Sequence, residues 1–269
     1  VLALTTNSIL LFIVFTSKRR EIGSYRYLIA TFACSDLIYT SIHWLVYPIP
    51  EMYGNAYLIS GHNLIRSRVG PCLYCAVYSQ AVPILTFHFL YRTFAIRSPH
   101  YLSKPKLFFG AMLLATIAVD LDGFFVMWVL FRPDEETLGK IAPFFAGNTS
   151  APVIHRLETG PDHVQALYWS GATFEGPRWA NLFGAFDMIV VISATYAIVI
   201  ICSMLINEYL KMNAKSSKTA CLHRQLFRSL VAQAIYPMIT TYFPLAVCVF
   251  LPIFGLNFDW VPVLSPTMC

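Results

Sequence analysis

Residues 181–206 read NLFGAFDMIVVISATYAIVIICSMLI, and this stretch decides the class of fold. Asp187 is its only charged residue. A helix needs about 20 apolar residues to cross the hydrocarbon core of a bilayer, because each residue rises about 1.5 Å. Residues 181–206 are therefore a predicted transmembrane helix. Four further apolar blocks meet the same requirement, at residues 27–50, 69–96, 107–131 and 226–254.

The two ends of the chain are apolar but shorter than a full crossing. Residues 1–17 fall slightly short, and residues 256–269 are shorter still and contain Pro262 and Pro266. We therefore expect six spans and the beginning of a seventh, with both ends cut from a parent of seven helices. A six-helix protein is the alternative. Because the sequence has no internal repeat and no second soluble domain, residues 1–269 are expected to form one transmembrane helical bundle.

The composition also requires a membrane. Hydrophobic residues make up 57% of the chain and charged residues 12%, and a soluble domain of this length cannot hide so much apolar surface. The formal net charge of +5 does not indicate a nucleic-acid partner. Such a site gathers its basic residues on one accessible face, and here apolar spans separate them. The lipid bilayer is the expected partner.

The positive charges lie in alternate gaps between the apolar blocks. Thirteen of the nineteen Lys and Arg residues fall in three gaps: Lys18, Arg19, Arg20 and Arg26; Arg92, Arg97, Lys104 and Lys106; and Lys211, Lys215, Lys218, Arg224 and Arg228. The other gaps hold only six. Lys and Arg are enriched in the cytoplasmic loops of membrane proteins. The three basic gaps are therefore predicted to be cytoplasmic, and the amino terminus to lie outside.

The longest gap, the outward loop of residues 132–178, is predicted to face away from the cytoplasm. It is too long for an ordinary helix connection, and loops of this length usually fold over a site or stay mobile. It also contains the chain's only glycosylation acceptor, Asn148-Thr149-Ser150, which belongs on an outward surface. The charge bias and the acceptor sequence therefore predict the same sidedness.

Ionisable side chains inside the spans are costly unless they find a partner, so they are the first candidates for function. Asp36 is expected either to bind an ion or water network that shifts on activation, or to hydrogen-bond a neighbouring helix. Asp120 and Asp122 point to opposing sides of one helix, which favours structural burial over a shared metal or proton. His88 and Arg92 share one helix face near the cytoplasmic end. Arg92 either forms a breakable pair that couples helix movement to the cytoplasm, or extends to the interface.

Four prolines interrupt the third and sixth spans, namely Pro83, Pro237, Pro244 and Pro252. Each removes a backbone hydrogen-bond donor and favours a kink. A kinked helix can pivot. The sixth span is therefore a candidate lever in a conformational switch.

The sequence contains no motif of catalytic or cofactor chemistry. There is no phosphate-binding glycine loop, no His-Glu-x-x-His and no glycine-framed serine. Cys72-x-x-Cys75 has redox or metal spacing, but it has no second pair and no nearby His, so an incidental pair of thiols is the favoured interpretation. We therefore expect no enzyme activity, no cofactor and no metal site.

Several motifs resemble those of one family. They are Gly23-Ser24-Tyr25-Arg26-Tyr27-Leu28 before the second span, His88-Phe89-Leu90-Tyr91-Arg92 at the end of the third, and the run Arg224-Gln225-Leu226-Phe227-Arg228-Ser229-Leu230-Val231-Ala232-Gln233 that continues to Pro237, Pro244 and Pro252. Almost end to end, the chain resembles the nematode serpentine chemoreceptors of the Str and Srj class. These are a branch of the seven-helix G-protein-coupled receptors.

The resemblance implies an all-α membrane protein with a seven-transmembrane, GPCR-like bundle, whose first helix is shortened here and whose seventh is nearly absent. It implies a plasma-membrane receptor of the sensory-neuron cilium that binds a small odorant or soluble cue and activates a heterotrimeric G protein. The implied activation switch comprises Asp36, His88, Tyr91 and Arg92, with Tyr91 in place of the acid found in rhodopsin-like receptors. The implied G-protein-facing residues are Lys211, Lys215, Lys218, Arg224 and Arg228.

The resemblance also raises the question of what holds the outward loop. Rhodopsin-like receptors usually tie this loop to the third helix by a disulfide, yet no Cys occurs between Arg132 and Arg178. The loop must therefore be held by other contacts.

An aromatic ligand pocket is expected in the outer half of the bundle, with walls formed by Tyr78, Phe186, Tyr242 and Phe243. The main rival function is a membrane transporter or channel. Asp36 and Asp120 supply two midplane acids for such a pathway, but the sequence offers neither an inverted repeat nor an intramembrane base to match them. A receptor is therefore the favoured prediction.

Overall fold

The computed structural model describes residues 2–16, 25–53, 56–134, 163–170, 176–212 and 218–254. Within them, five helical segments are long and apolar enough to cross a membrane: Arg26–Val46, Val69–Arg97, Pro105–Leu130, Trp179–Met212 and Arg224–Phe254. A shorter apolar helix, α1, covers Leu2–Thr16. These helices confirm the five predicted spans and the short first block. The expected stub at residues 256–269 lies outside the described residues.

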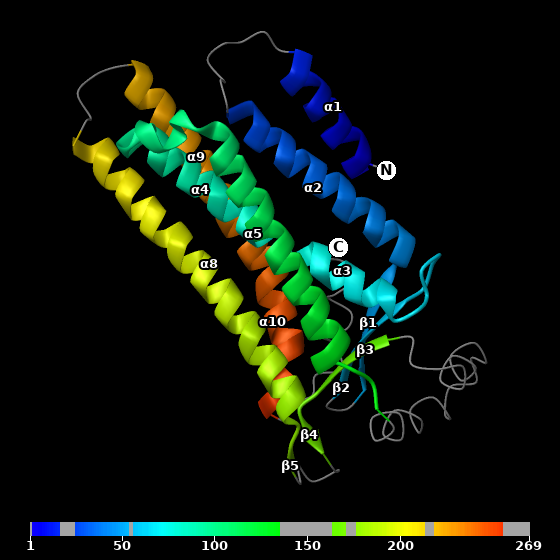
Figure 1. Cartoon of the computed structure of the whole chain (residues 1–269). Helices are drawn as coiled ribbons and strands as arrows, with labels where there is room; N and C mark the ends of the chain where they lie inside the picture. The colour runs from blue at the N-terminus through cyan, green and yellow to red at the C-terminus, as the bar shows by residue number, and fades with distance from the viewer. Residues whose placement is uncertain are drawn as a thin grey trace. The chain divides into compact units, whose positions relative to one another are not determined.

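Within these segments the helices divide into shorter elements (Figure 1). The α-helices are α2 (Tyr25–Val46), α3 (Val69–Ser79), α4 (Ala81–Arg97), α5 (Pro105–Phe125), α8 (Trp179–Met212), α9 (Lys218–Pro237) and α10 (Phe243–Phe250). The π-helical turns are η3 (Val126–Leu130) and η4 (Met238–Tyr242), and the 3-10 helices are η2 (Pro99–Ser103) and η5 (Leu251–Phe254). The strands are β1 (Pro48–Tyr53), β2 (Ala56–Gly61), β3 (His163–Leu167), β4 (Trp169–Ser170) and β5 (Gly176–Pro177).

Helix α2 ends earlier than the sequence predicted. It stops at Val46, and Tyr47 adopts a positive φ of 46°, a conformation that leaves the right-handed helix. Pro48 follows and starts β1, because it has no backbone N–H with which to continue a helix. The predicted end of this span at residue 50 is therefore wrong, and the apolar residues beyond Val46 belong to a strand.

The predicted proline interruptions are confirmed. The third span breaks between α3 and α4, where Pro83 has no N–H to donate to the carbonyl of Ser79 four residues earlier. In the sixth span, α9 ends at Pro237, a π-helical turn follows, Pro244 lies in the first turn of α10, and Pro252 lies in η5. Each irregularity of these two spans therefore contains a proline or lies within three residues of one.

The chain divides into two compact units. Unit 1 comprises Val1–Thr40, Tyr78–Asp120 and Val190–Met238, and unit 2 comprises Ser41–Val77, Leu121–Ile189 and Ile239–Cys269. In unit 1, helices α4, α8 and α9 share a core of buried side chains. These are Phe89, Val199, Cys202, Ile206, Leu210, Leu230 and Ala234. All three basic gaps of the sequence belong to unit 1.

Unit 2 contains a feature that the all-α prediction lacked, a three-stranded antiparallel sheet in the order β1-β2-β3, here called the cap sheet (Figure 1). Tyr57 pairs with Ala166 and Ile59 with Val164, so these four side chains share one face of the sheet. That face packs into the core of unit 2. The helical side chains of this core include Cys72, Val126, Ala185 and Cys248.

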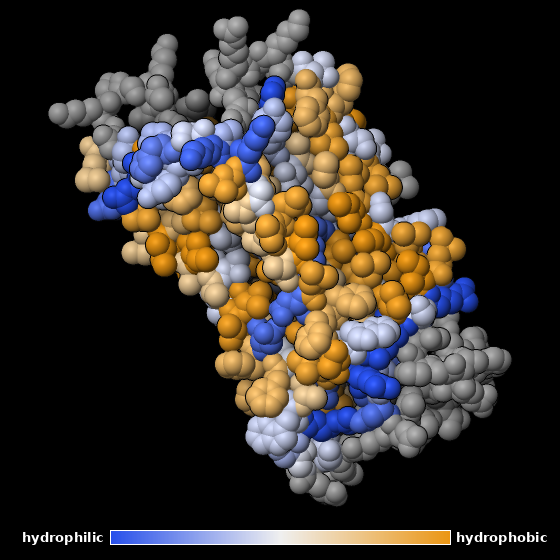
Figure 2. All heavy atoms as spheres, in the orientation of Figure 1, coloured by the Kyte–Doolittle hydropathy of each residue, from blue (hydrophilic) through white to orange (hydrophobic). Residues whose placement is uncertain are grey.

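Large apolar side chains are exposed along the spans. On α5 they include Leu113, Leu114 and Leu121, and on α8 Ile200, Ile201 and Met204, each more than half exposed. Figure 2 shows hydrophobic side chains over much of the visible helix surface. Extended apolar surface of this kind is expected where lipid contacts the protein. The surface therefore agrees with a multi-pass membrane protein.

Candidate functional site

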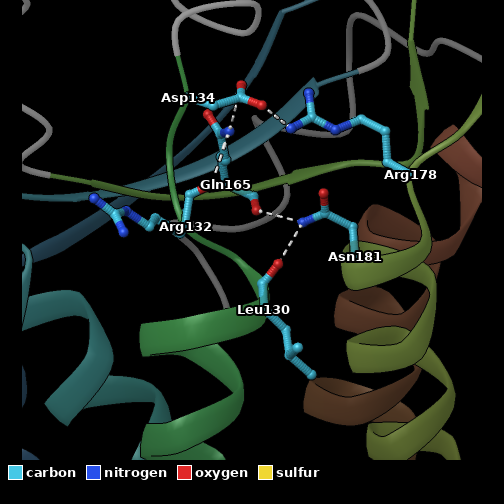
Figure 3. A network of polar contacts seen from close by, with 6 residues as sticks. All are labelled: Leu130, Arg132, Asp134, Gln165, Arg178 and Asn181. Atoms are coloured by element: carbon cyan, nitrogen blue, oxygen red, sulfur yellow. Dashed lines mark hydrogen bonds and ion pairs between the residues drawn. The ribbon is translucent and has the colours of Figure 1, made fainter.

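In unit 2, a buried polar network holds the described parts of the outward loop (Figure 3). Gln165 of β3 is only 1% exposed, and its side-chain amide donates to the Arg132 carbonyl at 3.2 Å. Its backbone N–H donates to the Phe131 carbonyl at 3.1 Å. The same side chain also reaches Asp134 at 3.4 Å. These bonds fix β3 beside the chain that leaves η3.

The network continues to the beginning of α8. Arg178 forms an ion pair with Asp134, and its backbone N–H donates to the Tyr168 carbonyl at 2.8 Å. Asn181 is 2% exposed, and its side-chain amide donates to the Leu130 and Gln165 carbonyls at 3.1 and 3.3 Å. Figure 3 shows these contacts converging between the ends of two helices and a strand. The outward loop has no cysteine that could form a disulfide, and these bonds hold its described parts instead.

Sequence reasoning missed this network. In the sequence, Asp134 and Arg178 are only two of the charged residues in or beside the outward loop. Nothing in the sequence marked Gln165 or Asn181 as a functional candidate. The partners are separated by 16 to 51 residues along the chain, so no local pattern indicates which of them meet.

Beside the network lies a group of basic side chains, Arg68, Arg132 and His163, here called the cationic cluster. Arg68 donates a hydrogen bond to the Trp128 carbonyl, and its guanidinium lies 4.4 Å from the centroid of the Trp128 ring. Burial lowers the pKa of Arg68, and the charge of Arg132 lowers it further. Figure 3 shows the Arg132 guanidinium pointing away from the Asp134 carboxylate.

His163 begins β3 and is 7% exposed. Burial lowers its pKa to about 4; a hydrogen bond with Gln165 raises the pKa, and the charge of Arg68 lowers it. The imidazole is therefore neutral at pH 7. Its Nε2 atom and the Nε atom of Arg68 are buried and have no hydrogen-bond partner among the described residues.

All four predicted switch residues belong to unit 1. The Asp36 carboxyl is hydrogen-bonded by Asn7 of α1, which corresponds to the second of its two predicted roles. His88 is buried, with its ring 5.9 Å from that of Phe32. Tyr91 packs edge-on against Phe108 at 5.7 Å.

Arg92 lies one turn after His88 on α4 and is half-buried. Five residues further on, Arg97 forms an ion pair with Glu208 of α8 at 3.6 Å, which the sequence did not indicate. Glu208 is 58% exposed at its side chain, so water screens this pair. The last two turns of α4 therefore contain a half-buried arginine, Arg92, and a surface arginine, Arg97, that is paired with Glu208.

Asp122 of α5 and Asp187 of α8 are hydrogen-bonded to each other in unit 2. A hydrogen bond between two carboxyl groups requires one shared proton, because an ionised carboxylate only accepts. The prediction that one of the two α5 acids meets an adjacent helix is therefore confirmed for Asp122. The partner of Asp122 is Asp187 and not Asp120, which agrees with the expectation that the two acids of α5 do not share a proton with each other.

The four residues of the predicted ligand pocket are divided between the two units. Tyr78 belongs to unit 1, where its ring lies 6.2 Å from that of Tyr39, and the other three belong to unit 2. Phe186 and Phe243 are 63% and 66% exposed, so the described helices do not enclose them. Tyr242 lies in η4 and is half-buried. The aromatic pocket stays a prediction.

The predicted G-protein-facing residues are described in part. Lys211, Arg224 and Arg228 are exposed, the first on α8 and the others on α9, and Lys218 begins α9. Lys215 lies outside the described residues, as does Asn148, the predicted glycosylation site. Cys72 is buried in the core of unit 2 with Cys75 packed against that core, and both are free thiols, which agrees with an incidental pair.

Comparison with known proteins covers nearly the whole chain. The chain is similar to serpentine receptor class r-10 of Caenorhabditis briggsae, with 25% identity over 94% of this chain and 75% of the relative. It is also similar to serpentine receptor class r-10 of Caenorhabditis elegans, with 24% identity over 90% of this chain and 73% of the relative. A third relative, serpentine receptor class J-38 of Caenorhabditis elegans, is 23% identical over 95% of this chain and 78% of its own length.

No solved structure matches the chain significantly. The family described as serpentine type 7TM GPCR chemoreceptor Str has a model that matches residues 1–268. This match confirms the resemblance that the motifs indicated. The chain belongs to the Str family of serpentine seven-transmembrane chemoreceptors.

Proposed function

We propose that this chemoreceptor binds a small odorant or soluble cue from its outward side and activates a heterotrimeric G protein at its cytoplasmic side. The observation that carries the proposal is the family match over residues 1–268, which includes every described span. Family membership supports a chemosensory receptor in a membrane. The ligand class, the G protein and the location in a sensory-neuron cilium are our inference.

The distribution of charge supports the proposed orientation. Thirteen of the nineteen Lys and Arg residues belong to the three gaps of unit 1, which the positive-inside rule assigns to the cytoplasm. The exposed side chains of Lys211, Arg224 and Arg228 lie on the helices that border one of these gaps. A G protein that docks there meets a basic surface.

In the proposed mechanism, ligand binding favours a state in which the sixth span moves and exposes a cytoplasmic cleft. The irregular segment from Pro237 to Pro252 supports this idea, because a π-helical turn between two α-helices is a point at which a span can bend. Arg92 is the proposed switch residue. Its half-buried charge changes partners as the helices move.

A nucleotide-exchange assay tests the proposal. Membranes containing the receptor and a heterotrimeric G protein are exposed to a panel of small volatile and water-soluble compounds. At least one compound is expected to accelerate guanine-nucleotide exchange. Arg92→Gln is expected to lower the maximal rate at least about tenfold without changing surface expression, which corresponds to about 1.4 kcal/mol in the activation free energy of exchange.

Lys106→Gln is the matched control, because it removes an exposed charge at the beginning of α5 and should leave exchange unchanged. Equal rates in Arg92→Gln and the unmodified receptor would remove Arg92 from the switch. Substrate flux into receptor vesicles, with no exchange on any G protein, would instead support a transporter.

A further inference from the structure

The turn between β2 and α3 is fastened to the end of α2. The last four carbonyl groups of a helix have no partner inside that helix. Residues of the turn donate to three of those in α2: the Asn63 side chain to Trp44 at 2.7 Å, the Ile65 N–H to Leu45 at 3.0 Å, and the His62 N–H to Val46 at 2.8 Å. Residues 62–65 are therefore held against the last turn of α2.

These bonds determine the depth of the turn in the bilayer. The span Arg26–Val46 contains 21 residues. At about 1.5 Å per residue such a helix is about as long as the hydrocarbon core is thick, roughly 30 Å, so its ends lie at the two membrane interfaces. Residues 62–65 are bonded to the last turn and lie at the same interface. In the proposed orientation this is the outward one.

Three large side chains at this interface are exposed. Trp44 is 62% exposed, Tyr47 56% and Leu64 67%. Trp and Tyr are enriched at membrane interfaces, where the ring is buried in lipid and the polar group reaches water. Leu64 has no polar group to offer water, and contact with acyl chains would bury it. Lipid is therefore the partner that fits all three side chains.

The backbone of Tyr47 supports a role for its side chain. Its φ of 46° lies in the left-handed region, which glycine adopts without the clash that a Cβ atom causes. Residues in such conformations persist where the surrounding structure holds them, and they are frequent at functional positions. The chain thus has an exposed aromatic ring at a position where the backbone favours glycine.

Arg66 adds a positive charge to this surface. Its side chain is exposed, and its Nε atom donates to the Asn63 carbonyl at 2.9 Å, which ties the guanidinium to the fastened turn. Among the described residues, none accepts a hydrogen bond from its two terminal nitrogens. Arginine binds phosphate through two parallel N–H groups, and the phosphates of a bilayer lie just outside the hydrocarbon core.

We propose that Trp44, Tyr47, Leu64 and Arg66 form a phospholipid-binding surface at the outward membrane interface. The three large side chains contact the upper part of the acyl chains, and the terminal nitrogens of Arg66 donate to the headgroup phosphate. The surface anchors the turn before α3 in the membrane. It depends on the spans and their orientation, and not on the ligand or the G protein of the proposed function.

Quenching of tryptophan fluorescence by brominated phospholipids locates the surface. The full chain is placed in phosphatidylcholine nanodiscs whose lipid is brominated either near the headgroup or near the chain end. The difference between the unmodified chain and Trp44→Phe gives the signal of Trp44, and Leu64→Trp adds a second probe at an exposed position. Both signals are expected to lose more intensity with the shallow bromines than with the deep ones, and to be protected from iodide in the water.

Arg66→Gln tests the contact with the headgroup. The chain in maltoside micelles is titrated with phosphatidylcholine or with diacylglycerol of the same chains, and the thermal unfolding midpoint is followed. Phosphatidylcholine is expected to raise the midpoint to a saturating value, because it binds the folded state, and diacylglycerol to raise it less. Arg66→Gln is expected to raise the half-saturating proportion of phosphatidylcholine about fivefold, the effect of one arginine near a membrane surface.

Arg132→Gln is the matched control for the charge. Arg132 is also an exposed arginine of unit 2, but its chain neighbours Phe131 and Pro133 are buried, so it lacks exposed apolar side chains next to it. This variant should bind phosphatidylcholine as the unmodified chain does. An equal loss in both variants would show that only net charge matters and would remove the specific contact of Arg66.

Other outcomes overturn the surface as a whole. If iodide quenched both tryptophan signals and brominated lipid quenched neither, the turn would lie in water. Stronger quenching of both by the deep bromines would place it inside the hydrocarbon core. Equal shifts with phosphatidylcholine and diacylglycerol would exclude the phosphate contact. None of these measurements uses a G protein or a chemosensory ligand, so failure of the proposed function would not affect them.

Discussion

Asn181 shows how a single buried amide can replace a covalent link. Its side chain donates to the carbonyl of Leu130 at the end of η3 and to that of Gln165 in β3, while its own backbone lies in the first turn of α8. Three segments therefore meet at one residue. Because the residue is 2% exposed, water cannot replace these bonds when the side chain is lost.

We predict that Asn181→Leu destabilises unit 2. The substitution keeps a similar volume but removes the donor, and leaving two buried carbonyls without it should cost about 1–3 kcal/mol. The thermal unfolding midpoint of the purified receptor, followed by tryptophan fluorescence, measures the loss. Asn63→Leu is the matched control, since Asn63 makes the same type of bond to the Trp44 carbonyl at 2.7 Å but at an exposed position. An equal loss in both variants would contradict the role of burial.

His163 makes the stability of unit 2 depend on pH. Burial lowers its pKa to about 4, against 6.5 for the ordinary side chain, so the unfolded chain takes up a proton at a higher pH than the folded chain does. Stability therefore falls as the pH falls from about 6.5 to about 4, by up to about 3 kcal/mol. The unfolding midpoint measured from pH 7 to pH 4.5 should show this slope, and His163→Gln should reduce it. His100→Gln, at an exposed histidine of η2, should keep it. Identical slopes in all three proteins would contradict the prediction.

At the scale of elements, local signals predicted the helices and missed the cap sheet. The proline positions predicted where the third and sixth spans become irregular, because a proline removes a hydrogen bond within its own turn of helix. The pairing of β2 with β3 joins Leu58 to Gln165, residues separated by the whole of α3, α4 and α5. No short stretch of sequence contains that information. The same reason explains why the cationic cluster and the network around Gln165 were not foreseen.

The contact between α8 and the end of the π-helical turn depends on a glycine. A Cβ atom added to Gly184 would lie 2.7 Å from Cε2 of Phe131, a ring that is 2% exposed and held in the core of unit 2. We predict that Gly184→Ala lowers the free energy of unfolding by about 1–3 kcal/mol, because the buried ring cannot move freely. Thermal unfolding measures the change.

Gly110→Ala is the matched control for this glycine. It also lies within a helix, α5, but an added Cβ meets no atom within 4 Å. Alanine has the higher helix propensity, so this change should be neutral or stabilise by up to about 1 kcal/mol. A similar destabilisation by the two substitutions would show that close packing at Phe131 is not the cause.

At the scale of the whole molecule, most of what could be predicted from the sequence came from the distribution of charged and hydrophobic residues. The five long spans follow from the cost of exposing apolar residues to water, which depends on composition alone. The proposed orientation follows from the number of Lys and Arg residues in each gap, which requires no knowledge of packing. The polar network around Gln165 is different in kind, since it depends on side chains that only the folded chain brings together.

The orientation yields a prediction on residues that lie outside the described ranges. When the receptor is made in cells that glycosylate membrane proteins, Asn148 should carry a glycan, because the loop that contains it reaches the lumen where the transferase acts. Both Asn148→Gln and Ser150→Ala should abolish the mobility shift that an endoglycosidase removes, since each destroys the acceptor sequence. An acceptor sequence inserted beside Lys215 should stay unmodified, because the cytoplasmic gap that holds five basic residues is not translocated. A glycan beside Lys215, with none at Asn148, would invert the receptor and place the basic surface proposed for the G protein outside the cell.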